Sequence, residues 1–158
     1  RTSDSVKYGK LSNNPFVEFT LPSIINPDFA PSGKHVLSAT IQYAPYHLRS
    51  QAWSEELNVK LKDNVVKILE NYIPNISSMI ESSYVLSPVN LESQFGLTEG
   101  NLNHGEMTLD QFFFMRPTLS SSQYESPIKN LYLCGPGTHP GGGIHGTNGY
   151  NAAREILK

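Results

Sequence analysis

The segment LYLCGPGTHPGGGIHGTNGYNAAREILK, residues 131–158, constrains the fold most because it places a run of glycines between an apolar run and a helix-like one. Gly141, Gly143 and Gly146 match the pattern G-x-G-x-x-G, which opens the helix of a dinucleotide-binding βαβ unit. Such a unit needs a second strand and an acidic residue about 20 residues further on. The sequence has neither after Gly146, so we do not expect a Rossmann fingerprint here.

The same segment still predicts a turn that attracts negative charge. Unpaired N–H groups and the positive dipole end at the start of the following helix favour an anion or an electron-rich carbonyl. The glycines at 141–143 would let a flat ligand approach the backbone, because no Cβ stands in the way. Glycine content alone agrees equally well with a flexible or tightly turning surface loop.

Length and charge narrow the class of protein. A chain of 158 residues is long enough for one domain with a sizeable core. The 12 Lys and Arg residues against 14 Asp and Glu residues leave no basic excess, so we expect no nucleic-acid partner and no membrane-surface partner. No apolar run reaches the length of a transmembrane segment. The polar start without Met indicates a processed or truncated chain.

The single cysteine, Cys134, excludes an internal disulfide and favours a reducing compartment. We therefore expect a soluble cytoplasmic protein, with the mitochondrial matrix as the eukaryotic alternative. Because Cys134 lies in the apolar run LYLCG, the sequence predicts a buried structural thiol.

Hydrophobic patterning predicts the elements around this segment. Alternation over 16–21 and β-branched and aromatic residues over 35–46 predict two strands. Apolar residues recur at helical spacing over 54–73, after an acidic first turn and before Pro74. Shorter signals predict a strand at 84–86, a helical turn from about 90 to 96, a strand buried on both faces at 131–134, and a last helix starting between 146 and 148. The apolar block FFFM at 112–115 has no assignable period.

Four segments together resemble one enzyme family: LPSIINPDFAPSGKHVLSATIQYAPY, LESQFGLTEGNLNHGEMTLDQFFFMRP, SPIKNLYLCG and NLYLCGPGTHPGGGIHGTNGYNAAREIL. The family is that of phytoene dehydrogenase (phytoene desaturase)-related flavoproteins, and the resemblance is strongest to its pyridine nucleotide-disulfide oxidoreductase domain-containing branch. It covers most of residues 15–158. Nothing in the sequence corresponds to the N-terminal FAD-binding Rossmann half, so the resemblance implies the C-terminal part of such an enzyme.

The resemblance implies an α+β fold in two portions. Residues 1–126 would carry the mixed sheet and long helix of a substrate domain, and residues 127–158 the closing strand, glycine-rich loop and C-terminal helix of an FAD-binding domain. The whole enzyme would oxidise or desaturate a small-molecule or lipid-like organic substrate by hydride transfer to FAD. The N-terminal FAD-binding portion of the same protein would be the partner, and the chain alone would be inactive. The alternative is a non-catalytic binding or assembly module derived from the same fold.

The resemblance also implies a cofactor-binding set, namely Gly135, Gly137, Thr138, Gly142, Gly143, Ile144, His145 and Asn148. The first two glycines would let the backbone pass beside the ribityl chain, and the amides of 143–145 would face the flavin pyrimidine edge. A helix N-terminus there would stabilise the charge that develops on reduction. Pro136 stands where many related flavoproteins have an acidic residue, so Thr138 or Asn148 would take over the ribityl contact.

Other polar residues have alternative interpretations. His104, His139 and His145 match no standard ligand spacing, so we expect no metal site. His104, Glu106 and Asp110 form either a proton-accepting group or, as we favour, a network that orders a loop. Arg116 either pairs with Asp110 or binds an anionic substrate group. The sequence identifies no catalytic residue.

Overall fold

The computed structural model describes residues 2–158 of the chain, with side chains from Asp4 onward. Length alone predicted one domain, but the chain divides into two compact units, Arg1–Val89 (unit 1) and Asn90–Lys158 (unit 2). This division follows contacts within the backbone. The boundary predicted between residues 126 and 127 separates a substrate-domain portion from an FAD-binding portion, and it stays a prediction. No helix in the described part of the chain has the length and apolar character needed to cross a bilayer.

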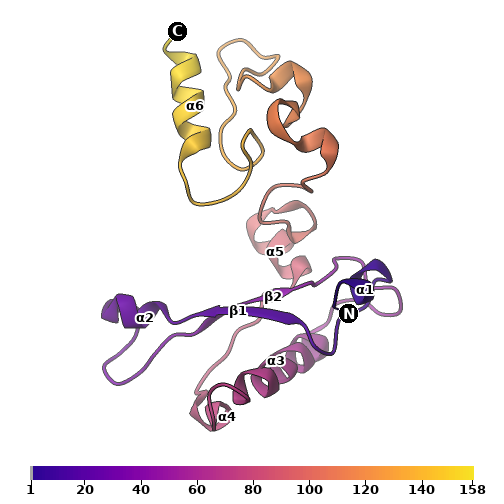
Figure 1. Cartoon of the computed structure of the whole chain (residues 1–158), viewed down its shortest axis with the longest axis vertical. Helices are drawn as coiled ribbons and strands as arrows, with labels where there is room; N and C mark the ends of the chain where they lie inside the picture. The colour runs from indigo at the N-terminus through magenta and orange to yellow at the C-terminus, as the bar shows by residue number, and fades with distance from the viewer. Residues whose placement is uncertain (1) are drawn as a thin grey trace. The chain divides into compact units, whose positions relative to one another are not determined.

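Unit 1 combines a two-stranded antiparallel sheet with one long helix, which agrees with the predicted α+β class (Figure 1). Its elements in chain order are α1 (Thr2–Lys7), β1 (Phe16–Thr20), α2 (Pro22–Ile25), η1 (Pro27–Phe29), β2 (Ser38–Gln42), α3 (Glu55–Glu70) and α4 (Ile76–Met79). Val17 of β1 lies opposite Ile41 of β2, and both pack against the buried cluster of Val65, Leu69 and Ile76. Both strands, the one predicted from alternation and the one predicted from β-branched and aromatic residues, are therefore confirmed. Strand β2 is shorter than predicted because Thr20, the last paired residue of β1, faces Ser38.

Helix α3 confirms the prediction for residues 54–73. The Ser54 hydroxyl accepts a hydrogen bond from Leu57 N at 3.2 Å, and Glu55 and Glu56 lie in the first turn, where the helix dipole favours negative charge. The residues buried along one stripe include Leu57, Leu61, Val65 and Leu69. The apolar spacing and the acidic first turn depend on residues close together in the chain, which is why the sequence predicts this helix.

Unit 2 contains short helical elements joined by loops. After α5 (Pro88–Phe95), it has the 3₁₀ turns η2 (Thr98–Gly100), η3 (Leu109–Gln111), η4 (Phe113–Met115) and η5 (Leu119–Ser121), followed by α6 (Thr147–Ile156). Helix α5 confirms the predicted turn, which ends at Gly96 with a φ of 68°. Within the unassigned block 112–115, residues 113–115 form η4, and two of its rings are largely exposed, Phe113 at 72% and Phe114 at 60%.

The predicted short strand at 84–86 is wrong. Residues 84–86 belong to no strand, and the side chains of Tyr84 and Leu86 are exposed. An extended segment becomes a strand only where a neighbouring segment supplies hydrogen-bonding partners, and these residues are paired with no strand.

The predicted buried strand at 131–134 is also wrong. The segment forms a single isolated bridge, between Tyr132 and Glu125, and Leu131 is 47% exposed. Burial on both faces needs a sheet around the strand, and the only sheet among the described residues consists of β1 and β2. The predicted burial of Cys134 is wrong for the same reason, because its side chain is exposed.

We therefore expect Cys134 to react rapidly with a thiol reagent such as dithionitrobenzoate in the native 158-residue chain at neutral pH. An exposed thiol is accessible to the reagent without unfolding. Labelling before and after addition of urea measures the effect, and the two rates should be similar. A native rate that is much lower than the denatured rate would show that the thiol is covered.

Candidate functional site

The candidate site is the glycine loop, Gly135–Gly146, together with the start of α6. Gly146 precedes the helix as its N-cap with a φ of 65°, a conformation that residues with a Cβ rarely adopt. The predicted start of the last helix between 146 and 148 is confirmed. The ring of His145 accepts a hydrogen bond at Nδ1 from Thr147 N at 3.1 Å, so it caps one of the free amides of the first helical turn.

A buried asparagine ties the two ends of this loop together. Asn148 Nδ2 donates to Gly135 O at 2.8 Å and to Thr138 O at 3.0 Å, and it also lies within bonding distance of Thr138 Oγ1 and His139 O. The hydroxyl of Thr138, which is 2% exposed, donates to Gly135 O at 2.9 Å. Both side chains therefore hold the loop from within. Their predicted contact with a ribityl chain stays a prediction.

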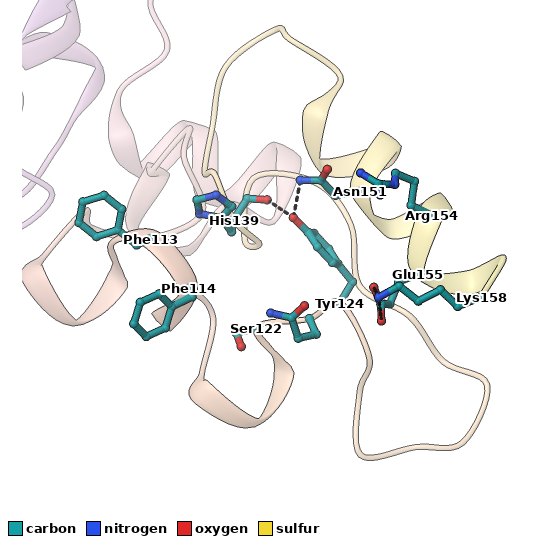
Figure 2. A pocket seen from close by; sticks show the side chains of 10 residues that line it. Phe113, Phe114, Ser122, Tyr124, His139, Asn151, Arg154, Glu155 and Lys158 are labelled. Carbon is teal, nitrogen blue, oxygen red and sulfur yellow. Dashed lines mark hydrogen bonds and ion pairs between the residues drawn. The ribbon is translucent and has the colours of Figure 1, made fainter.

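Tyr124 supports the same loop and was missed by sequence reasoning. Its buried hydroxyl donates to His139 O at 2.8 Å and accepts from Asn151 Nδ2 of α6 at 2.8 Å; Figure 2 shows both bonds. The only signal in the sequence was a tyrosine within the polar run SSSQYESP. Tyr124 thus connects the loop before residue 131 to the glycine loop and to α6.

Two of the loop glycines make room for the chain itself. A Cβ on Gly141 would lie 3.3 Å from Met107 Cε, and a Cβ on Gly142 would lie 2.8 Å from Asn103 Cγ. The close approach that these glycines permit is therefore used by the segment 103–107. The residues that follow, 143–145, are exposed, and the Ile144 side chain is fully exposed. The exposed part of the loop therefore contains residues 143–145, whose amides the family resemblance implies would face the flavin.

Arg116 anchors the segment that packs on Gly141 and Gly142. The residue is 2% exposed, and its guanidinium donates to Asn103 O at 2.5 Å and to His104 O at 3.1 Å and contacts Met107 Sδ. Of the two alternatives for Arg116, the pairing with Asp110 is wrong, because these buried contacts occupy the guanidinium. A hydrogen bond from the side chain of Thr108 instead lowers the pKa of the exposed Asp110 carboxyl.

The remaining sequence-predicted residues are not brought together into one cluster. His104 and Glu106 are exposed, whereas His139 is partly buried beside Tyr124. Among the residues that the structure describes, no group of three or more His, Cys, Asp or Glu side chains is arranged to hold a metal ion. Gly135 and Gly137 both have open space where a Cβ would stand. The φ of 93° at Gly135 favours glycine there, whereas neither space nor φ explains the glycine at 137.

No family model matches the chain. It is 40% identical over 156 residues to rat pyridine nucleotide-disulfide oxidoreductase domain-containing protein 2. This alignment covers 98% of this chain and 27% of the rat protein. It is 32% identical over 129 residues to the lycopene-forming phytoene desaturase of Pseudescherichia vulneris, covering 79% of this chain and 25% of the relative. It is also 29% identical over 123 residues to a limonene dehydrogenase component of Castellaniella defragrans, covering 77% and 22%.

These similarities confirm the predicted resemblance of the chain to the phytoene desaturase-related oxidoreductases, over most of its length. The similarity to pyridine nucleotide-disulfide oxidoreductase domain-containing protein 2 extends over nearly the whole chain, in the rat and in the mouse proteins alike. The chain spans about a quarter of the length of these relatives, between 22% and 27%.

Proposed function

We propose that the chain is the C-terminal part of an FAD-dependent oxidoreductase that oxidises or desaturates a lipid-like organic substrate. The relatives are named as oxidoreductases, dehydrogenases and desaturases, and the chain aligns with only a quarter of their length. In this proposal residues 127–158 contribute to the flavin site, and the rest of the protein contributes the part that binds the pyrophosphate.

The observation that carries the proposal is the exposure of residues 143–145, just before Gly146, the N-cap of α6. Gly143 has a φ of 127° and presents no side chain, and the neighbouring residues are exposed as well. Amides in this position, backed by a helix N-terminus, favour an electron-rich carbonyl edge. The residues present therefore fit one edge of a flavin ring.

The hydrogen-bonded supports of the loop would keep these amides in place. Asn148 and Thr138 fix the first half of the loop to the start of α6, and Tyr124 fixes His139. Because the donors would be oriented before the ligand arrives, little reorganisation is needed when negative charge develops near them. When bound, FAD supplies the hydride acceptor, which no side chain of this chain could provide.

The experiment that tests the proposal is a visible absorption spectrum of the purified full-length protein. A bound oxidised flavin gives two absorption bands, in the near-ultraviolet and blue, which disappear on reduction. A colourless full-length protein that gains no such bands after incubation with FAD would contradict the proposal and favour the binding or assembly module.

The isolated 158-residue chain should bind FAD only weakly. The exposed loop offers contacts to one edge of the ring only. The free-energy cost of immobilising FAD would have to be offset mainly by contacts to the rest of the cofactor, and the proposal assigns those contacts to the rest of the protein. Titration of FAD, followed by its fluorescence, should give a dissociation constant above about 10 μM. Riboflavin is the matched control, and we expect it to bind about as weakly as FAD. Sub-micromolar binding of FAD would show that the chain holds a complete site.

A further inference from the structure

A second candidate site lies in unit 2, in a cavity between η4 and α6. Its volume is about 460 Å³, which falls within the range of sites for small organic molecules. Figure 2 shows Phe113 and Phe114 on one side, Tyr124 and His139 in the middle, and Arg154, Glu155 and Lys158 of α6 on the other side. The cavity therefore has an aromatic end and a charged end.

The aromatic end offers exposed rings rather than a closed core. Phe113 and Phe114 belong to η4 and leave most of their surface accessible. Phe113 and Tyr124 both adopt positive φ angles, 54° and 70°, which are costly for residues with large side chains. Such strained conformations occur preferentially where a side chain is held for a functional reason. An aromatic ring would pack against the two exposed rings in an offset or edge-to-face arrangement.

The hydroxyl of Tyr124, in the middle of the cavity, is fully used by the chain itself. The Tyr124 hydroxyl already donates its hydrogen to His139 O and accepts one from Asn151, so it has no proton left for a ligand. The ring of Tyr124 therefore contributes mainly apolar surface. A ligand that crosses the cavity over this ring would place an apolar linker against it.

The charged end leaves one cation available. Lys158 Nζ bonds both carboxylate oxygens of Glu155, at 2.8 and 2.7 Å, so these two charges largely compensate each other. Arg154 has no carboxylate within ion-pair distance in the described part of the chain, and its guanidinium carbon lies 5.8 Å from the centre of the Tyr150 ring. A guanidinium beside a ring keeps N–H groups with which it can bind a carboxylate in bidentate geometry.

We propose that this cavity binds an aryl-substituted carboxylic acid, with the aromatic ring against Phe113 and Phe114 and the carboxylate at Arg154. The proposal goes beyond the flavin site, since it needs no contact with residues 143–145 and no bound flavin. Glu155 contributes to selectivity, because its charge would repel an acid placed at the Lys158 side and leaves Arg154 as the preferred partner.

The test uses 4-phenylbutyrate as the probe and the neutral alcohol 4-phenylbutanol as its isostere. Titration of the 158-residue chain with the acid, followed by amide shifts in its nuclear magnetic resonance spectrum, should show saturable binding. We expect a dissociation constant of about 1 mM. The alcohol should bind about tenfold more weakly, because it cannot accept the charge-assisted bonds of Arg154. The shifted amides should be those of residues 113–114, 122–124 and 151–158.

Two variants separate the two ends of the cavity. Arg154→Gln should weaken binding of the acid about tenfold and leave binding of the alcohol unchanged, whereas Phe114→Ser should weaken binding of both compounds to a similar extent. Both positions are exposed, so the fold should be retained, and unshifted signals from unit 1 would verify this. Arg49→Gln, an exposed arginine in unit 1, is the matched control and should change neither affinity.

Several outcomes would overturn the proposal. Absence of saturable binding up to about 10 mM, equal affinities for acid and alcohol, or shifts outside the cavity would each do so. The full-length protein must show the same preference, because binding by the 158-residue chain alone would mean that the rest of the protein covers the cavity. Flavin content is measured separately, so a colourless protein that still prefers the acid would contradict the proposed function and support this site.

Discussion

Replacing Arg116 with alanine should lower the free energy of unfolding of unit 2 by about 3 kcal/mol. The guanidinium is buried and donates to the carbonyls of Asn103 and His104, so its removal leaves two acceptors without partners and a cavity beneath the segment 103–107. Because the single tryptophan, Trp53, lies in unit 1, native-state hydrogen exchange of the amides of residues 90–158 is the suitable measurement.

Two comparisons identify the cause of this loss. Arg116→Met keeps most of the side-chain volume but has no hydrogen-bond donor. It should therefore keep the stabilisation that comes from packing and still lower the free energy of unfolding of unit 2 by about 2 kcal/mol. Arg49→Ala removes an exposed arginine and should change stability by less than about 0.5 kcal/mol. If Arg116→Ala exchanges as slowly as the wild type, the arginine does not hold the segment that packs on the glycine loop.

Replacing Gly143 with valine in the full-length protein should lower its flavin content more than about tenfold, if the proposed function is correct. The φ of 127° is unfavourable for any residue with a Cβ, and a Cβ here would lie 2.9 Å from His145 Cδ2. The His145 ring would have to move, and its hydrogen bond to Thr147 N at the start of α6 would be lost. The ratio of flavin absorbance to protein absorbance measures the effect.

Gly33→Val is the matched control for this experiment. Gly33 also has a positive φ, 77°, but a Cβ there would meet open space, and the residue lies in unit 1. The control should therefore lose stability through backbone strain while keeping its flavin. Wild-type flavin content and an unshifted spectrum in Gly143→Val would mean that the ring does not lie at residues 143–145.

Much of unit 1 could be predicted from the sequence. The stripe of Leu57, Leu61 and Val65 after an acidic first turn predicted α3. Alternation at 16–21 and β-branched and aromatic residues at 35–46 predicted the two strands of the sheet. These signals work because period and capping depend on residues a few positions apart. The start of α6 after Gly146 was predictable for the same reason.

The strands predicted at 84–86 and 131–134 show where such reasoning stops. An apolar run indicates that a segment is suited to a buried strand. The neighbouring strands that supply its hydrogen-bonding partners, and the layers that cover it, come from other parts of a protein. For 131–134 the described residues supply one bridge, to Glu125, so Leu131 and Cys134 remain exposed.

The candidate site divides in the same way. The sequence by itself determined that a glycine-rich turn leads into a helix N-terminus, since both properties are encoded in neighbouring residues. Only the tertiary structure decided that Asn103 and Met107 occupy the space beside Gly142 and Gly141, that Arg116 is buried beneath them, and that Tyr124 holds His139. Each of these contacts joins residues that are distant along the chain, and their formation depends on the packing of whole segments, which no local pattern records.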